Sequence, residues 1–140
     1  MSANWLLDVN VLLALGWAEH EAHEAVVERL SGRARWATCA ITQLGFVRIS
    51  STAGVFSVTT TPAQAQQALA QLCADKQHRF LADMPDVLGM DLSGLQGPKQ
   101  TTDAYLIHLA QHHGMKLLTL DRRLMNSFPK ALAQLVENPL

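Results

Sequence analysis

Three aspartates stand where a carboxylate could do chemistry. Asp8 follows the apolar residues 5–7, and Asp121 follows the largely apolar segment 116–120. Asp103 begins a segment whose apolar positions recur three, four and seven residues later, as on the buried face of a helix. In an open parallel sheet, ligands bind beyond the carboxyl ends of the strands, where loops and helix N-termini converge. We therefore expect Asp8 and Asp121 to face one crevice, with Asp103 at the same edge.

Each aspartate also has a simpler explanation as a helix cap. Asp is a favoured N-cap residue, and its negative charge suits a helix N-terminus, which accounts for each position taken singly. Capping does not explain why an apolar strand runs into Asp twice, since serine or threonine would cap as well. The joint pattern favours a shared site.

A shared site of three carboxylates implies a cation. The carboxylates would repel one another and raise their own pKa values unless a positive ion neutralised them. Mg²⁺ or Mn²⁺ binds one or two carboxylates, keeps several waters and accepts substrate phosphate oxygens. Such an ion lowers the pKa of an attacking water and neutralises developing charge. These residues predict metal-dependent phosphodiester hydrolysis without identifying the substrate.

Composition bounds the class of protein. The chain has 140 residues, of which 49% are hydrophobic and 16% charged, as expected of one globular domain spanning 1–140. The formal net charge of -1 excludes a generally basic surface, so a bound polyanion must be held by a local basic patch or by metal ions.

The apolar runs are shorter than the roughly 20 residues of a membrane span. No Lys or Arg precedes Arg29, and Asp8 interrupts the first apolar region, which is unlike a secretory signal. We therefore expect a cytoplasmic protein without membrane contact. Cys39 and Cys73 are then expected to be reduced and to pack as small hydrophobic residues.

Strands are expected to alternate with helices along the chain. The expected strands are residues 4–8, 35–38, 79–82, 116–120 and 132–136. The expected helices are 9–17, 19–30, 40–49, 61–75, 100–113 and 122–128, where 40–49 is also compatible with a strand. Residues 83–97, rich in Gly and Pro, are expected to form a loop. The alternation predicts a three-layer α/β/α sandwich with a central parallel sheet.

Four sequence blocks resemble the motifs of PIN-domain toxins of the VapC type. They are LLDVNVLLAL at 6–15, TQLGFVR at 42–48, TDAYL at 102–106 and TLDRRL at 119–124. The blocks occur in the family's order and cover nearly the whole chain. The resemblance implies a PIN-like fold and a metal-dependent endoribonuclease that cuts structured RNA. It also implies neutralisation by a cognate antitoxin and a toxin homodimer.

The resemblance also implies roles for individual residues. Asp8, Asp103 and Asp121 would be the metal-binding and catalytic acids, and Asn10 would steady the first of them or a bound water. Arg48, Thr102 and Arg122 stand within the motif blocks, and we expect them to support the site or contact the substrate. Guanidinium groups suit bidentate phosphate contacts, and Arg122 is our preferred RNA contact. A solvated charge, or for Arg48 an ion pair at the acidic site, is the alternative.

Gln43 departs from the commonest family pattern. Many PIN domains carry a glutamate in this block, whereas a subset of VapC-like sequences shares the glutamine. The position implies a catalytic role, but an amide offers an oxygen without charge, so a second metal ion should bind more weakly. A helix-surface glutamine without a role is the alternative.

A histidine pair invites comparison with a zinc motif. His20 and His23 are one turn apart, but one residue separates Glu21 from His23 where the metalloprotease motif requires two. We interpret the pair as surface histidines, with substrate contact as the alternative.

Two other functions fit part of the pattern. A buried strand ending in Asp8 also resembles the nucleophile strand of haloacid-dehalogenase-like phosphatases, but these need an acid two residues later, where this chain has Asn10. A non-catalytic PIN module that binds antitoxin or RNA is the second alternative, and the retention of three aspartates argues against it.

Overall fold

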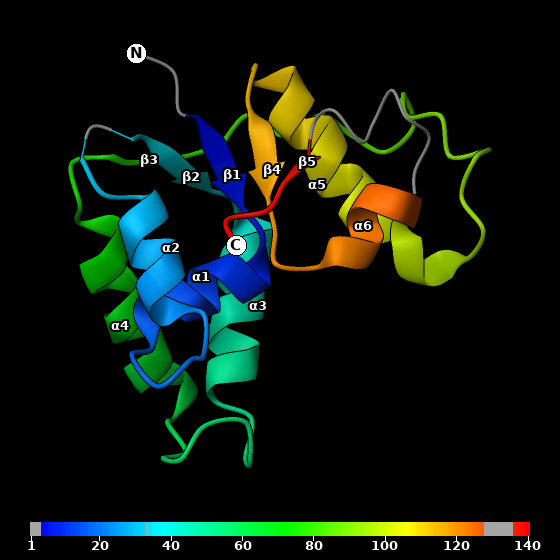
Figure 1. The fold of residues 1–140 in the computed structure, drawn as a ribbon. Helices are drawn as coiled ribbons and strands as arrows, with labels where there is room; N and C mark the ends of the chain where they lie inside the picture. The colour runs from blue at the N-terminus through cyan, green and yellow to red at the C-terminus, as the bar shows by residue number, and fades with distance from the viewer. Residues whose placement is uncertain (1–3, 33, 128–135) are drawn as a thin grey trace.

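The sheet is parallel and all its strands are short. The computed structural model describes residues 4–32, 34–127 and 136–140. Within these ranges a five-stranded sheet has the order β3-β2-β1-β4-β5 (Figure 1). The strands are β1 (Trp5–Leu7), β2 (Trp36–Thr38), β3 (His78–Phe80), β4 (Lys116–Leu118) and β5 (Val136–Glu137). All four neighbouring pairs are parallel.

Alternation along the two central strands creates two separate cores. Leu6 pairs with Leu117, and both belong to the core under α5 (Thr101–His112). Leu7 pairs with Leu118, and both belong to the core on the opposite face. All four of these leucines are fully buried. Because successive side chains of a strand point to opposite faces, apolar residues at consecutive positions require helices on both sides.

The opposite face is covered by helices from the first half of the chain (Figure 1). They are α1 (Val9–Gly16), α2 (His23–Arg29), α3 (Ala40–Ser50) and α4 (Pro62–Cys73). Two further short helices of the described residues are η1 (Pro98–Gln100) and α6 (Arg122–Ser127). The three-layer α/β/α sandwich expected from the sequence is therefore confirmed.

The direction of strand addition reverses at β1. The chain adds β2 and then β3 on one side of β1, and afterwards adds β4 and β5 on the other side. Loops leaving β1 and β4 therefore diverge to opposite faces, and in open α/β sheets ligands bind beyond the carboxyl ends of strands at such a point. Asp8 and Asp121 follow these two strands.

Most predicted elements agree with the structure, and the differences are local. Residues 40–50 are helical, which decides between the two interpretations of that segment. The second helix begins at His23 and not at residue 19, because a turn precedes it in which the Ala22 amide donates to His20 Nδ1 at 3.0 Å. The last strand is Val136–Glu137, and residues 132–135 of its prediction lie outside the described residues, as does residue 128 of the last helix.

Across the described parts of the chain, none of the helices has the length and apolar character needed to span a membrane.

Candidate active site

Asp8 joins the end of β1 to the start of α1. It is the N-cap of α1, and its Oδ1 accepts a hydrogen bond from the Val9 amide at 2.8 Å. Its Oδ2 accepts a hydrogen bond from the Thr119 hydroxyl at 2.7 Å. The residue is 8% exposed. Asp8 is therefore a true helix cap, but its second oxygen is directed across the sheet to the end of β4.

Thr119 organises the residues around Asp8. It is fully buried directly after β4, and its Oγ1 accepts hydrogen bonds from the Asp121 amide at 3.1 Å and from Asn10 Nδ2 at 3.4 Å. Asn10 Oδ1 in turn accepts from the Leu120 amide at 3.1 Å. A hydroxyl has one hydrogen to donate and two lone pairs, so Thr119 uses its full capacity here. This network ties the loop after β4 to the start of α1.

Asp103 lies in the first turn of α5 and is partly buried. Burial, followed by the charges of Asp8 and Asp121, raises its pKa to about 6. The charges of Asp8 and Asp121 both act on the pKa of Asp103, so the three carboxylates lie near enough to interact through space. The expectation that α5 brings Asp103 to the edge occupied by Asp8 and Asp121 agrees with this coupling.

Burial also raises the pKa of Asp8. The hydrogen bonds from Thr119 and Val9 act in the opposite direction by stabilising the carboxylate, and the charge of Asp121 raises the pKa further. The Asp8 carboxylate is therefore shielded from water. It accepts hydrogen bonds from Thr119 and Val9 and is repelled by the charge of Asp121. An added cation would relieve both the desolvation and the repulsion.

Asp121 is more exposed than Asp8, with 34% of its side chain exposed. Its Oδ1 accepts a hydrogen bond from the Arg123 amide at 3.0 Å and lies 3.5 Å from Arg123 Nε. Arg122 begins α6, is exposed and follows Asp121 directly in sequence. The site therefore has an open side that carries positive charge as well as the carboxylates.

Strand alternation explains which predicted residues meet. Asp8 and Thr119 each come two positions after a residue of the α5 core, Leu6 and Leu117, so they continue the α5 side of the sheet. Asp103 is on α5 itself. Thr38 follows Trp36, a residue of the opposite core, by two positions.

Gln43 is held on that opposite side. Its Nε2 donates to Thr38 Oγ1 at 3.0 Å and lies 4.0 Å from the Cys73 sulfur on α4. Thr38 is also 2.7 Å from His78 Nε2 of β3. The hydrogen bonds described for Gln43 thus connect β2 to α4, and none of them involves the three aspartates.

The other predicted supporting residues are spread around the edge of the sheet. Arg48 is exposed in the last turn of α3, about 12 Å along the helix from its start. Thr102 is exposed at the start of α5, where it lines a pocket together with Met84 and Pro85. The structure brings neither side chain into the hydrogen-bond network described for Asp8.

His20 and His23 make separate local contacts. His20 accepts from Ala22 as described above, and His23 Nδ1 lies 2.7 Å from the Ala14 carbonyl oxygen of α1. These contacts support the turn between α1 and α2. Both histidines are partly buried in these contacts.

Thr119 was absent from the residues predicted for the site. It lies within a motif block, but a buried threonine at a strand end is ordinary in composition and gives no sign of its partner. One signal was available. Thr119 and Asp121 are two residues apart after a strand, which is the spacing at which a side-chain oxygen can accept from a backbone amide.

The donor set fits a hard divalent cation. Three carboxylates and the Asn10 amide oxygen offer oxygen ligands or outer hydrogen-bond partners, as Mg²⁺ and Mn²⁺ prefer. A bound cation would offset the burial and the repulsion that raise the pKa values of Asp8 and Asp103. The residues present therefore suit a bound divalent metal.

The doubly wound sheet, with Asp8 and Asp121 following its two central strands, defines an α/β protein with a candidate site at the strand switch point. A family model for the PIN domain matches residues 5–130. The chain belongs to the PIN domain family, and its relatives are of the VapC type.

Two such relatives come from Mycobacterium tuberculosis. Ribonuclease VapC38 is 41% identical over 118 residues, covering 83% of this chain and 84% of the relative. Ribonuclease VapC39 is 39% identical over 136 residues, covering 94% of this chain and 98% of the relative.

A solved structure, the VapBC2 of Rickettsia felis bound to a DNA fragment from their promoter, contains a similar fold. Its TM-score is 0.61 at 13% identity, and the match covers 96% of this chain and 97% of that chain. At this identity the likeness concerns the fold alone.

Proposed function

We propose that this chain is a divalent-metal-dependent endoribonuclease and the toxin of a toxin–antitoxin pair. The observation that carries the proposal is the hydrogen-bond network in which buried Thr119 donates to Asp8 and accepts from the Asp121 amide, while the charges of both acids raise the pKa of Asp103 on α5. The names of the VapC relatives support ribonuclease activity.

In this proposal Asp8, Asp103 and Asp121 hold Mg²⁺ or Mn²⁺. When bound, such an ion supplies a water of lowered pKa and neutralises charge that develops on a phosphate. Asp8 can hold the ion as a carboxylate because the Thr119 hydroxyl and the Val9 amide donate hydrogen bonds to its two oxygens. Both hydrogen bonds also orient the carboxylate, so little rearrangement is needed when the ion binds.

The remaining residues position the acids and the substrate. Asn10 and Thr119 hold the loop after β4 so that Asp121 remains beside Asp8. Arg122 is exposed next to Asp121 and suits a bidentate contact with RNA phosphate. Local positive charge of this kind is needed because the chain has a formal net charge of -1.

The phosphatase alternative fits the geometry poorly. That chemistry needs an acid at position 10, and Asn10 is engaged through both ends of its amide, with Thr119 and with the Leu120 backbone. The other alternative, a non-catalytic binding module, draws support from Gln43, whose hydrogen bonds go to Thr38 and Cys73.

Cleavage of RNA by the purified chain tests the proposal. We expect cleavage with Mg²⁺ or Mn²⁺, loss of cleavage with a chelator, and loss in Asp8→Asn. The matched control is Asp86→Asn. Asp86 is exposed and accepts a hydrogen bond from the Leu88 amide, which an asparagine oxygen can also accept. Equal cleavage by the wild type and Asp8→Asn would refute the assignment, and a metal-independent activity would refute the metal requirement.

The proposal includes an antitoxin, a homodimer and a cytoplasmic site of action. The solved VapBC2 assembly supports a protein partner for a chain of this fold. Co-expression with the neighbouring reading frame should suppress both growth arrest and RNA cleavage. Light scattering of the isolated chain should give about twice its mass of 15.3 kDa. A monomer at all concentrations would exclude the homodimer.

A further inference from the structure

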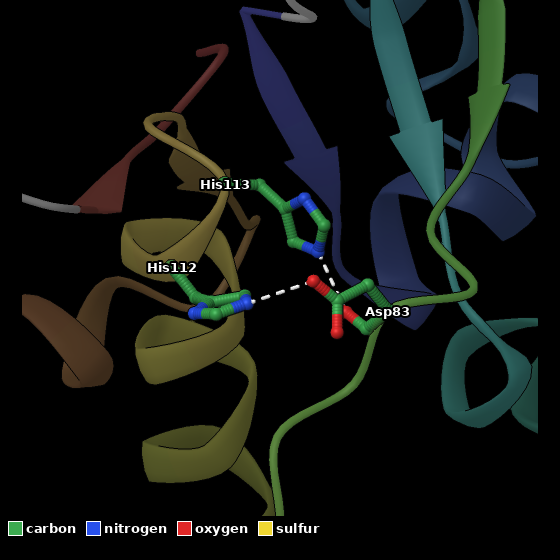
Figure 2. Close-up of side chains that lie close together, drawn as sticks. All are labelled: Asp83, His112 and His113. Atoms are coloured by element: carbon green, nitrogen blue, oxygen red, sulfur yellow. Dashed lines mark hydrogen bonds and ion pairs between the residues drawn. The ribbon is translucent and has the colours of Figure 1, made fainter.

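Two consecutive histidines at the end of α5 meet an aspartate from a distant loop. His112 is the last residue of α5, His113 is its C-cap, and Asp83 follows β3. His112 Nε2 lies 3.1 Å from Asp83 Oδ2, and His113 Nε2 lies 2.7 Å from the Asp83 carbonyl oxygen (Figure 2). None of these residues belongs to the site of Asp8, Asp103 and Asp121.

We propose that Asp83, His112 and His113 form a second metal site, which binds a divalent transition ion such as Zn²⁺. One potential ligand atom from each residue lies within 4.8 Å of the other two. Ligands about 2.0–2.1 Å from a tetrahedral ion are roughly 3.3 Å apart, and the His112–Asp83 pair already has nearly that separation. Small side-chain rotations bring the third ligand to the same ion.

The end of the helix explains why neighbouring histidines can converge. Consecutive residues inside a helix point about 100° apart and do not face one ligand. The helix ends here, because Gly114 adopts a positive φ of 70°. Figure 2 shows both rings directed toward Asp83, and the two ring centroids are 5.1 Å apart with the planes nearly perpendicular.

Charge and access also favour a cation at this place. Neutral imidazoles and one carboxylate give a site with one negative charge, and the C-terminal end of α5 adds the negative end of its dipole. Asp83 is 79% exposed and His112 is 41% exposed, so an ion can reach the site from solvent. Water can occupy the fourth position.

The ligand types select the metal. Imidazole nitrogen suits Zn²⁺, Ni²⁺ and Co²⁺, whereas Mg²⁺ and Ca²⁺ prefer oxygen ligands alone. In the metal-free arrangement His113 Nε2 carries its proton, since the Asp83 carbonyl can only accept. Binding through that nitrogen replaces this hydrogen bond and moves the proton to Nδ1.

The ion would link two parts of the chain that are 29 residues apart. Asp83 begins the loop that also includes Met84 and Pro85, and the Tyr105 hydroxyl of α5 donates to the Pro85 carbonyl at 2.6 Å. A metal at Asp83 would add a second, stronger attachment of this loop to the helix that carries Asp103. Zn²⁺ should therefore stabilise the fold.

Zn²⁺ binding to the untagged full chain tests the inference, measured by competition with a chromophoric chelator in millimolar Mg²⁺. We expect His112→Ala and His113→Ala each to weaken binding of one Zn²⁺ by at least about tenfold. The matched control is His108→Ala, on the same helix one turn earlier, which should bind as the wild type does. Equal affinity in the wild type and in His112→Ala would overturn the proposal.

The variant Asp8→Asn distinguishes Zn²⁺ binding at Asp83, His112 and His113 from Zn²⁺ binding at Asp8, Asp103 and Asp121. Zn²⁺ binding and a Zn²⁺-induced rise in Tm should persist in Asp8→Asn and disappear in His112→Ala. The reverse pattern would assign the ion to the aspartates and overturn the proposal. Thermal unfolding without Zn²⁺ establishes that each variant folds, and the exposed substitution Asp83→Ala provides a further test that does not alter the helix.

Discussion

The Thr119 hydroxyl donates a hydrogen bond of 2.7 Å to Asp8 Oδ2 and thereby joins residues 111 positions apart. It connects the ends of β1 and β4, the two strands between which the sheet reverses its order. The same oxygen accepts from the Asp121 amide. One buried hydroxyl therefore positions two of the three acids, as a hydrogen-bond partner positions the ligands of metal sites generally.

Replacing Thr119 by valine should destabilise the protein by about 1–3 kcal/mol, because it leaves a buried carboxylate without one of its donors. The pKa of Asp8 should rise further, and divalent-metal affinity should fall. Urea unfolding and a Mn²⁺ titration measure the two effects. Thr119→Ser keeps the hydroxyl and should retain metal affinity; if the valine and serine variants bind Mn²⁺ equally, the hydrogen bond does not orient Asp8.

Stability of the metal-free protein should fall as the pH rises from about 4 to about 6. The pKa of Asp103 is about 6 in the folded protein and 3.8 ordinarily, so in this range the folded state binds more protons than the unfolded state. The contribution is present at low pH and is lost as the pH rises through the folded pKa. Chemical denaturation at several pH values measures it.

Asp103→Asn should flatten this pH dependence and raise the free energy of unfolding near neutral pH by about 1 kcal/mol, a figure reduced for solvent screening because the side chain is only partly buried. Asp86→Asn should keep the slope. Addition of Mg²⁺ should stabilise the wild type more than the asparagine variant. An unchanged slope in Asp103→Asn would show that Asp103 does not carry the effect.

Gln43→Glu should retain metal-dependent cleavage within about threefold. The side chain is held by Thr38 and Cys73, and the Thr38 hydroxyl can rotate to donate to a glutamate, so the local structure should survive. Gln43→Leu, which removes the hydrogen bond, should cost about 1 kcal/mol of stability. A tenfold gain in Mn²⁺ affinity in Gln43→Glu would instead mean that position 43 reaches the metal.

Gly45→Ala should destabilise the contact between α1 and α3. A Cβ at this position would lie 2.6 Å from Cγ2 of Val9. Val9 is the residue that follows Asp8 in the sequence. Overpacking costs about 1–3 kcal/mol, and the better helix propensity of alanine recovers about 1 kcal/mol of this. Thermal unfolding should show a lower Tm than for Gly89→Ala, where nothing lies within 4 Å.

The double variant Gly45→Ala with Val9→Ala tests the cause. If the clash with Val9 is responsible, the double variant should be more stable than the sum of the two single effects predicts. Simple additivity would place the strain elsewhere in the helix pair.

The secondary structure was largely predictable because it depends on local patterns. Thr61 caps α4 through the Gln64 amide, with proline at the first helical position, as the sequence indicated. The start of α2 was not predictable. It depends on the turn made by His20, which the helical spacing of the following apolar residues conceals.

The sequence by itself determined that Asp8 and Asp121 follow strands and that Asp103 opens a helix, because strand alternation, helix periodicity and capping act over a few residues. Only the tertiary structure decided which of these neighbours meet. Strand order places Thr119 against Asp8, the β2 face turns Gln43 toward α4, and the path of one loop carries Asp83 to His112. Contacts across 29 to 111 residues depend on how the layers pack, and no local pattern encodes that packing.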